Sequence, residues 1–251
     1  GIDLRESTRV ERVSASGGRI ALATLSAAGE RREVTGSHLL VAVGRKPRIE
    51  HLGLSAAGVE HTPQGVGVDA GQRTSNRRIF AIGDVAGAPQ FTHTAGHQAG
   101  IVLRRALFRL PARSERRAVP AVTYTEPELG EVGLSEAAAR ARYRNVTVQR
   151  WNFTQNDRAQ AEGQTQGLVK LVIDARGRVL GAGIVGAQAG ELLLPWILAV
   201  AERRKLGAFA QVIAPYPTLS EAGKRAAGAH FTPVLFSERT KRLVRFLARF
   251  G

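Results

Sequence analysis

The chain has 251 residues, enough for one large domain or two modest ones, each with its own core. Hydrophobic residues make up 43% and charged residues 23%, near the averages for globular domains, which excludes an intrinsically disordered chain and a membrane-embedded body. Cysteine is absent, so this chain by itself offers no disulfide, no thiolate metal site and no thiol nucleophile.

The formal charge is +15, from 36 Lys and Arg against 21 Asp and Glu, which favours a negatively charged partner. The arginines are spread along the chain and are not clustered beside stacking aromatic residues, so the pattern argues against nucleic acid. The longest apolar runs, residues 38–44 and 192–200, are far shorter than the roughly 20 residues that span a bilayer. Residues 1–6 carry no Met and no apolar signal core, so we expect a cut or processed end.

The first third of the chain predicts strands and then a helix. Alternating Ile20, Leu22 and Thr24 precede a polar turn at residues 28–32. Residues 39–44 are apolar at every position up to a closing Gly, which predicts a strand buried on both faces of a parallel sheet. A second strand is expected over residues 79–82, followed by a helix over about 94–107.

Residues 111–120 carry several arginines between two prolines, which predicts a solvated linker. Beyond it we expect a helix capped by Ser135, a hairpin over residues 168–185 that turns at 174–178, and helices over about 191–204 and from about 219. Strands and helices do not alternate regularly in this part, so the fold class is α/β followed by an α+β layer with an antiparallel sheet.

Residues 181–186 read G-A-G-I-V-G and match the G-x-G-x-x-G pattern of dinucleotide phosphate loops. A phosphate loop needs a helix directly after its glycines, whereas Ile184 and Val185 continue an apolar strand. We therefore interpret these residues as strand glycines.

Gly83 and Asp84 follow the apolar strand predicted over residues 79–82. A carboxylate at that strand end can accept hydrogen bonds from a ribityl or ribose hydroxyl, and Gly83 lets a ligand approach closely. The alternative is an ordinary Asp in a turn.

Five blocks in order along the chain resemble the pyridine nucleotide-disulfide oxidoreductases, the family of glutathione reductase, dihydrolipoamide dehydrogenase and mercuric reductase. The block at 74–84 resembles the family's second flavin-binding motif, and residues 40–47 resemble the strand that leaves its nucleotide domain. The remaining blocks are Thr125–Glu128 with Val132–Gly133, Asn156–Ala159 and Pro215–Glu221.

The resemblance implies four parts. They are the end of an NAD(P)-binding domain (1–44), the C-terminal half of an FAD-binding domain (45–117), a dimerisation domain (118–235) and a basic amphipathic tail (236–251). The family's flavin and nucleotide phosphate loops and its C-x4-C dithiol would lie upstream of Gly1. The tail has three open interpretations: an amphipathic helix on an anionic membrane surface, a helix docked on the body, or a segment frayed in solvent.

By resemblance, the cofactors are FAD and NAD(P). Asp84, beside Gly83, would bind the flavin ribityl chain, and the segment Thr92, His93, Thr94 and Ala95 would begin a helix whose N–H groups face the N1 edge of the flavin ring. A helix N-terminus stabilises negative charge at that edge by roughly 0.3–2 kcal/mol. His93 has the alternative of a surface histidine.

Gly44 and Arg45 would approach the nicotinamide nucleotide, with a solvated charge as the alternative for Arg45.

Tyr216 stands where thiol-handling members of the family carry an acid/base His, with Glu221 in the place of its partner. Tyr titrates near 10 and is a poor base at neutral pH, whereas His titrates near 6.5. Mercuric reductases are similar in carrying Tyr there, in contact with the metal ion. The alternative is that Tyr216 only packs at a subunit interface.

The resemblance thus implies a homodimeric, cytoplasmic oxidoreductase that passes electrons from NAD(P)H through FAD to an upstream dithiol, and on to a metal ion or a disulfide. No metal ion is expected to be bound as a resident cofactor. Two alternatives stay open: an enzyme like dihydrolipoamide dehydrogenase or glutathione reductase, and a non-catalytic dimerisation module that binds a partner.

Overall fold

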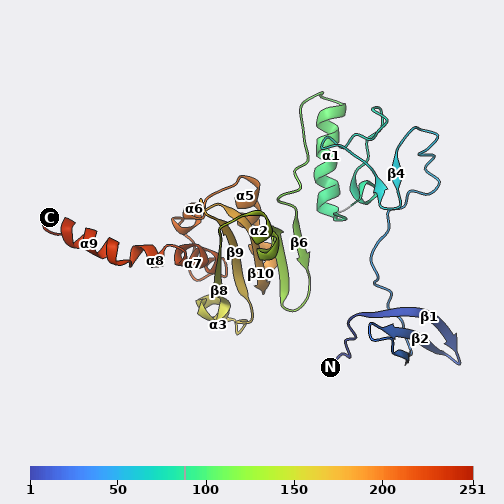
Figure 1. The fold of residues 1–251 in the computed structure, drawn as a ribbon, viewed down its shortest axis with the longest axis horizontal. Helices are drawn as coiled ribbons and strands as arrows, with labels where there is room; N and C mark the ends of the chain where they lie inside the picture. Colours follow the sequence, from blue (N-terminus) through green and yellow to red (C-terminus); the bar gives the residue numbers. More distant parts are fainter. Residues whose placement is uncertain (88, 251) are drawn as a thin grey trace. The chain divides into compact units, whose positions relative to one another are not determined.

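The computed structural model describes residues 1–87 and 89–250 and divides the chain into two compact units, residues 1–48 and the remainder (Figure 1). The first unit holds a three-stranded antiparallel sheet in the order β1-β2-β3. Its strands are β1 (Thr8–Ser16), β2 (Arg19–Ser26) and β3 (Arg31–Gly36). Gly17 and Gly18, with φ of 58° and 73°, form the tight turn between β1 and β2, a conformation that glycine adopts without strain. The strand β2 contains Ile20, Leu22 and Thr24, so the alternation of these residues predicted it correctly.

The buried strand expected over residues 39–44 is not formed. No helix or strand is assigned between residues 37 and 60, and Leu40, Val41 and Val43 are 89%, 68% and 91% exposed. An inner strand of a parallel sheet is stabilised by hydrogen-bonded neighbours on its two edges and by layers over both faces. In the first unit β1, β2 and β3 pair only with one another, so this apolar segment has no sheet to join.

The second unit begins with a short hairpin of β4 (His61–Thr62) and β5 (Gly65–Val66) beside a small core of Val59, Val66 and Ala81. The strand expected over residues 79–82 is also wrong, because Phe80 forms only a single antiparallel bridge, to Arg73. One bridge does not make a ladder of hydrogen bonds. The chain then enters the short 3-10 helix η1 (Gly83–Ala86) and the helix α1 (Thr92–Ala106), which begins two residues before its expected start.

Residues 111–119 connect α1 to a five-stranded sheet and form no helix or strand, as expected of the linker. The sheet has the order β6-β7-β10-β9-β8, and every neighbouring pair is antiparallel. This confirms the α+β layer, and the β9–β10 hairpin turns at residues 174–178 as predicted. The strands are β6 (Pro120–Thr123), β7 (Glu128–Gly133), β8 (Val146–Asn152), β9 (Leu168–Asp174) and β10 (Val179–Gly186).

Short helices surround this sheet. Ser135 caps α2 as predicted, since its side chain accepts a hydrogen bond from the Ala138 N–H at 3.2 Å. The single helix expected over 191–204 is two helices, because Pro195 lacks the N–H that would continue the first into the second. The helices are α2 (Glu136–Arg142), η2 (Phe153–Gln155), α3 (Asp157–Ala161), α4 (Ala189–Leu192), α5 (Leu194–Ala201), α6 (Gly207–Ala210) and α7 (Glu221–Ala229).

The main core lies where α5 meets β7 and β10 and where α7 meets β8 and β9. Val169, Leu171 and Ile173 of β9 are buried in it, whereas Lys170 between them contacts Glu136 of α2 at 2.8 Å. Because successive side chains of a strand point to opposite faces, α2 lies on the other side of the sheet.

Glu136 joins three cations on this other side of the sheet. Its carboxylate lies 2.9 Å from Arg140, 2.8 Å from Arg150 and 2.8 Å from Lys170. The hydrogen bond from Lys170, followed by that from Arg140, lowers the pKa of Glu136 from 4.5 to about 2. Arg140 and Arg150 are exposed and Glu136 and Lys170 are only half-buried, which keeps each single pair weak, so the network acts mainly by orienting α2 on β8 and β9.

The glycines at 181–186 are strand residues, as interpreted, because β10 pairs with β7 on one side and with β9 on the other. At Gly186 an added Cβ would lie 2.5 Å from Cε2 of Phe153, and at Gly167 (φ 115°) it would overlap the Val185 carbonyl. The close approach of the Phe153 ring and of the Val185 carbonyl at the edge of the sheet therefore accounts for glycine at these two positions.

The tail forms α8 (Thr232–Leu235) and α9 (Glu238–Leu247), the latter capped by Ser237. No side chain of α9 is buried, so this helix is not docked on the described body of the chain, and because it is formed over Glu238–Leu247 it is not frayed there. The interpretation of an anionic membrane surface stays a prediction. Among the described residues no helix has the length and apolar character needed to cross a membrane.

Candidate functional site

The turn at Gly83 and the first turn of α1 form one compact piece of structure. The Gly83 N–H donates a 2.7 Å hydrogen bond to Oε1 of Gln98, a buried side chain of α1. Gly83 has φ of 69°, and a Cβ on it would lie 3.2 Å from the Cβ of Ala95. Glycine is therefore required both by the backbone conformation and by the close approach of α1. Asp84 follows as the second residue of η1 and is half-buried.

The N-terminus of α1 carries polar groups that the helix itself does not satisfy. The first N–H groups of a helix have no acceptor within it, and the side chain of the N-cap residue Phe91 supplies none. No acidic residue lies in this first turn. The Thr94 hydroxyl is buried and has no hydrogen-bond partner in the described part of the structure. Unsatisfied donors at a helix N-terminus suit a ligand edge that carries negative charge, so these residues fit a flavin.

The side chain of His93 is engaged elsewhere. Its Nε2 lies 3.0 Å from the carbonyl oxygen of Pro120, and its ring stacks on Phe91 with a centroid distance of 5.0 Å. His93 therefore ties α1 to the first residue of β6. Thr92 beside it is exposed and Ala95 is half-buried.

Gly44 and Arg45 belong to the first unit, residues 1–48. Gly44 has φ of 101° and Arg45 is exposed. The structure thus brings Gly83, Asp84 and Thr92–Ala95 together in the second unit. Gly44 and Arg45 belong to the first unit, and the structure does not bring them to these residues.

Tyr216 lies on the segment between α6 and α7, and its hydroxyl donates a 2.9 Å hydrogen bond to Oδ2 of Asp157. That hydrogen bond, and then the negative charge of Asp157, raise the pKa of Tyr216 above its ordinary value of 10.0. The phenol thus stays protonated at neutral pH. The side chain of Tyr216 is 66% exposed, so it can meet a ligand or a partner.

Asn156 holds the Tyr216 segment against α3. It is 3% exposed, its Oδ1 accepts from the Ala159 N–H at 2.9 Å as the cap of α3, and its Nδ2 donates to the Thr218 carbonyl at 3.0 Å. The blocks at 156–159 and 215–221, far apart in sequence, therefore form a single site.

Glu221, the expected partner of Tyr216, instead forms an ion pair with Arg225 one turn along α7, at 2.8 Å. The hydrogen-bond partner of Tyr216 is Asp157, which the sequence analysis named only as part of the family block at 156–159. The available signal was that Asn156 and Asp157 belong to the family block at 156–159, but the pairing needed the tertiary structure. In the described part of the chain no cluster of His, Asp and Glu could hold a metal ion.

The second unit thus combines a glycine turn, a helix whose N-terminus has no side-chain cap, and an antiparallel α+β layer. Two family models match: "Pyridine nucleotide-disulphide oxidoreductase" over residues 1–99, and the dimerisation domain of the same family over residues 119–227. The chain belongs to the pyridine nucleotide-disulfide oxidoreductase family, whose members use FAD and NAD(P)H.

Curated relatives carry two different names. The dihydrolipoyl dehydrogenase of Rhizobium etli is 35% identical over 229 residues, which cover 90% of this chain and 47% of that protein. The mercuric reductase of Lysinibacillus sphaericus is 37% identical over 230 residues, covering 90% of this chain and 42% of that protein. The chain therefore spans less than half the length of these two relatives.

Solved structures agree on the fold. LpdA from Mycobacterium tuberculosis matches with a TM-score of 0.82 and 29% identity, over 89% of this chain and 48% of that one. The Cu(II) complex of the flavoprotein disulfide reductase RclA from Escherichia coli matches in fold, with a TM-score of 0.79 and 24% identity, over 88% of this chain and 50% of that one.

Proposed function

We propose that this chain supplies part of the flavin site and the dimerisation domain of an FAD- and NAD(P)H-dependent oxidoreductase that reduces a metal ion, in the manner of a mercuric reductase. When bound, FAD would take a hydride from NAD(P)H and pass the two electrons to a disulfide, which is thereby reduced to a dithiol. That dithiol would come from sequence outside this chain, since the chain has no cysteine.

In this proposal the residues at 83–95 position the flavin. Asp84 would accept hydrogen bonds from the ribityl hydroxyls, and Gly83 keeps the backbone close to α1. The N–H groups of Thr92, His93 and Thr94 would stabilise negative charge at the N1 edge, and the unsatisfied Thr94 hydroxyl offers a further donor. Gly44 and Arg45 would contact the nicotinamide nucleotide.

The observation that carries the choice of substrate is the neutral phenol of Tyr216. A Tyr whose proton is held by Asp157 and whose pKa is raised cannot take a proton from a thiol at neutral pH. A terminal oxidant that needs no proton relay, such as a thiolate-bound metal ion, suits this residue better than a disulfide does. Glu221, paired with Arg225, would keep α7 and the adjoining Tyr216 segment in place.

Dimerisation through residues 118–235 is part of the same proposal. Large apolar side chains around the Tyr216 segment are exposed, with Ile213 at 97%, Leu194 at 68% and Val212 at 50%. A second subunit that covers them would remove their apolar surface from water.

The test is a steady-state assay of the complete enzyme with Hg(II), oxidised glutathione and lipoamide. We expect turnover with Hg(II), and we expect Tyr216→Phe to lower metal reduction far more than flavin reduction by NAD(P)H. Tyr124→Phe, at a Tyr that is 82% exposed, is the matched control and should behave as wild type. Equal effects of Tyr216→Phe on both half-reactions would contradict a role of the Tyr216 hydroxyl in contacting the metal ion.

The second candidate is a dihydrolipoyl dehydrogenase, which the Rhizobium etli relative favours. It predicts turnover with lipoamide in place of Hg(II). A complete protein that lacks flavin absorbance would contradict both enzymes and leave the dimerisation module.

A further inference from the structure

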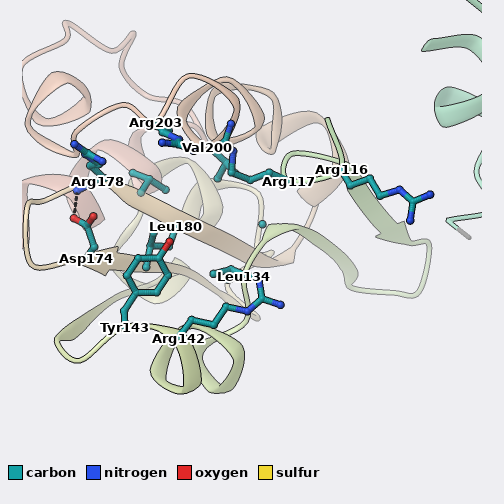
Figure 2. Close-up of a pocket in the computed structure, with 12 residues that line it drawn as sticks. Arg116, Arg117, Leu134, Arg142, Tyr143, Asp174, Arg178, Leu180, Val200 and Arg203 are labelled. Atoms are coloured by element: carbon teal, nitrogen blue, oxygen red, sulfur yellow. Dashed lines mark hydrogen bonds between the residues drawn. The ribbon is translucent and has the colours of Figure 1, made fainter. Parts of the chain in front are cut away.

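The second unit contains a cavity of about 530 Å³ that the proposed function does not use (Figure 2). Its walls come from the linker after α1, the end of β7, the end of α2, the β9–β10 turn and the end of α5. Ligand pockets in proteins typically measure 300–1,000 Å³, so this one has room for a small organic molecule. None of the residues proposed to bind flavin or metal lines it.

The cavity is strongly basic. Five arginines line it against the single carboxylate of Asp174, and that carboxylate already accepts the backbone N–H groups of Arg176 and Arg178, both at 2.8 Å. Figure 2 shows Arg116 extending away from the other labelled side chains, which leaves four arginines around the hollow. These are Arg117, Arg142, Arg178 and Arg203.

Few carboxylates of the described chain neutralise the charges of these four arginines. In the described part of the structure the side chains of Arg142, Arg178 and Arg203 form no ion pair. Arg117 pairs with Glu115, yet its Nε is buried and has no hydrogen-bond partner among the described residues. A buried donor without an acceptor destabilises the fold unless a ligand or water satisfies it. The guanidinium groups together suit an anion with several charges, because each can donate two parallel hydrogen bonds to a phosphate.

One wall of the cavity is apolar and aromatic. Leu134, Val179, Leu180 and Val200 line it, and the ring of Tyr143 is 40% exposed beside Arg142. Such a wall binds a flat ring system by burying its faces. We propose that this cavity binds a nucleoside polyphosphate, with the phosphates on the arginines and the base against Tyr143 and the apolar wall.

The test is calorimetric titration of the 251-residue chain with ATP, tripolyphosphate and adenosine. We expect ATP to bind at one site, with an affinity that falls steeply as salt is raised, because the arginines are only partly shielded from solvent. Tripolyphosphate, which lacks the base, should bind at least about tenfold more weakly, and adenosine, which lacks the phosphates, should not bind measurably.

Two variants localise the site. Arg142→Gln and Arg203→Gln each remove one charge at an exposed position, so both should fold as wild type, and each should weaken ATP binding about tenfold. Arg144→Gln changes the same charge two residues from Arg142 but outside the cavity, and should leave the affinity unchanged. The proposal is overturned if ATP does not bind, if either cavity variant binds ATP as wild type does, or if tripolyphosphate binds as tightly as ATP.

Discussion

Replacing Asn156 by Ala should destabilise the dimerisation layer, because this side chain makes two hydrogen bonds from a buried position. Its Oδ1 caps α3 at the Ala159 N–H, and its Nδ2 satisfies the Thr218 carbonyl. Loss of a helix cap costs about 1 kcal/mol. Leaving the half-buried Thr218 carbonyl without its donor costs about 1–2 kcal/mol more.

The sum is about 2–3 kcal/mol, and in a protein of this size each kcal/mol shifts the melting temperature by about 2–4 °C. We therefore expect Asn156→Ala to melt about 4–12 °C below wild type. Asn156→Thr keeps an oxygen to cap α3 and loses only the donor to Thr218, so its loss should be smaller.

The assay is thermal unfolding followed by circular dichroism, with urea unfolding as a second measurement. The matched control is Asn152→Ala, four residues earlier, whose side chain is exposed and should change the unfolding free energy by less than about 0.5 kcal/mol. If Asn156→Ala unfolds within that same margin, the two hydrogen bonds do not hold the Tyr216 segment, and the reasoning is refuted.

Three further predictions concern the same unit. Glu136 has a folded pKa of about 2 against 4.5, so its contribution to stability is present above pH 4.5 and is lost as pH falls toward 2; unfolding of Glu136→Gln should depend less on pH in that window. Gly167→Ala places a Cβ into the Val185 carbonyl and should lower the melting temperature strongly, whereas Gly163→Ala, where the space is open, should have a much smaller effect; equal losses would contradict the steric argument. In an ultraviolet titration Tyr216→Phe should remove the tyrosine that ionises above 10.0, and Asp157→Asn should bring that ionisation back toward its ordinary value; a transition unchanged by both variants would disprove the pairing.

Local signals predicted the dimerisation layer well. The cap at Ser135 and the turn at 174–178 depend on residues within a few positions of one another, and both appear where expected. The glycines at 181–186 were correctly assigned to a strand because no helix start follows them. For the residues expected at the flavin, the resemblance selected the positions, and the structure shows that Gly83 approaches Ala95 closely.

Predictions that depended on partners far away in the chain were less successful. The apolar residues 39–44 predicted an inner strand, but a strand also needs hydrogen-bonded neighbouring strands. Without such neighbours the segment forms no strand and is largely exposed. The short run at 79–82 likewise found a single bridge.

The sequence by itself therefore determined the family blocks, the local turns and caps, and the replacement of a titrating His by Tyr216. Only the tertiary structure decided that Tyr216 pairs with Asp157, 59 residues away, and that arginines from the linker, α2, the β9–β10 turn and the segment after α5 line one cavity. The physical reason is range: hydrogen-bond caps and turn conformations are set by neighbours along the chain, whereas a charge pair or a pocket exists only when the packing of the sheet and helices brings distant side chains together.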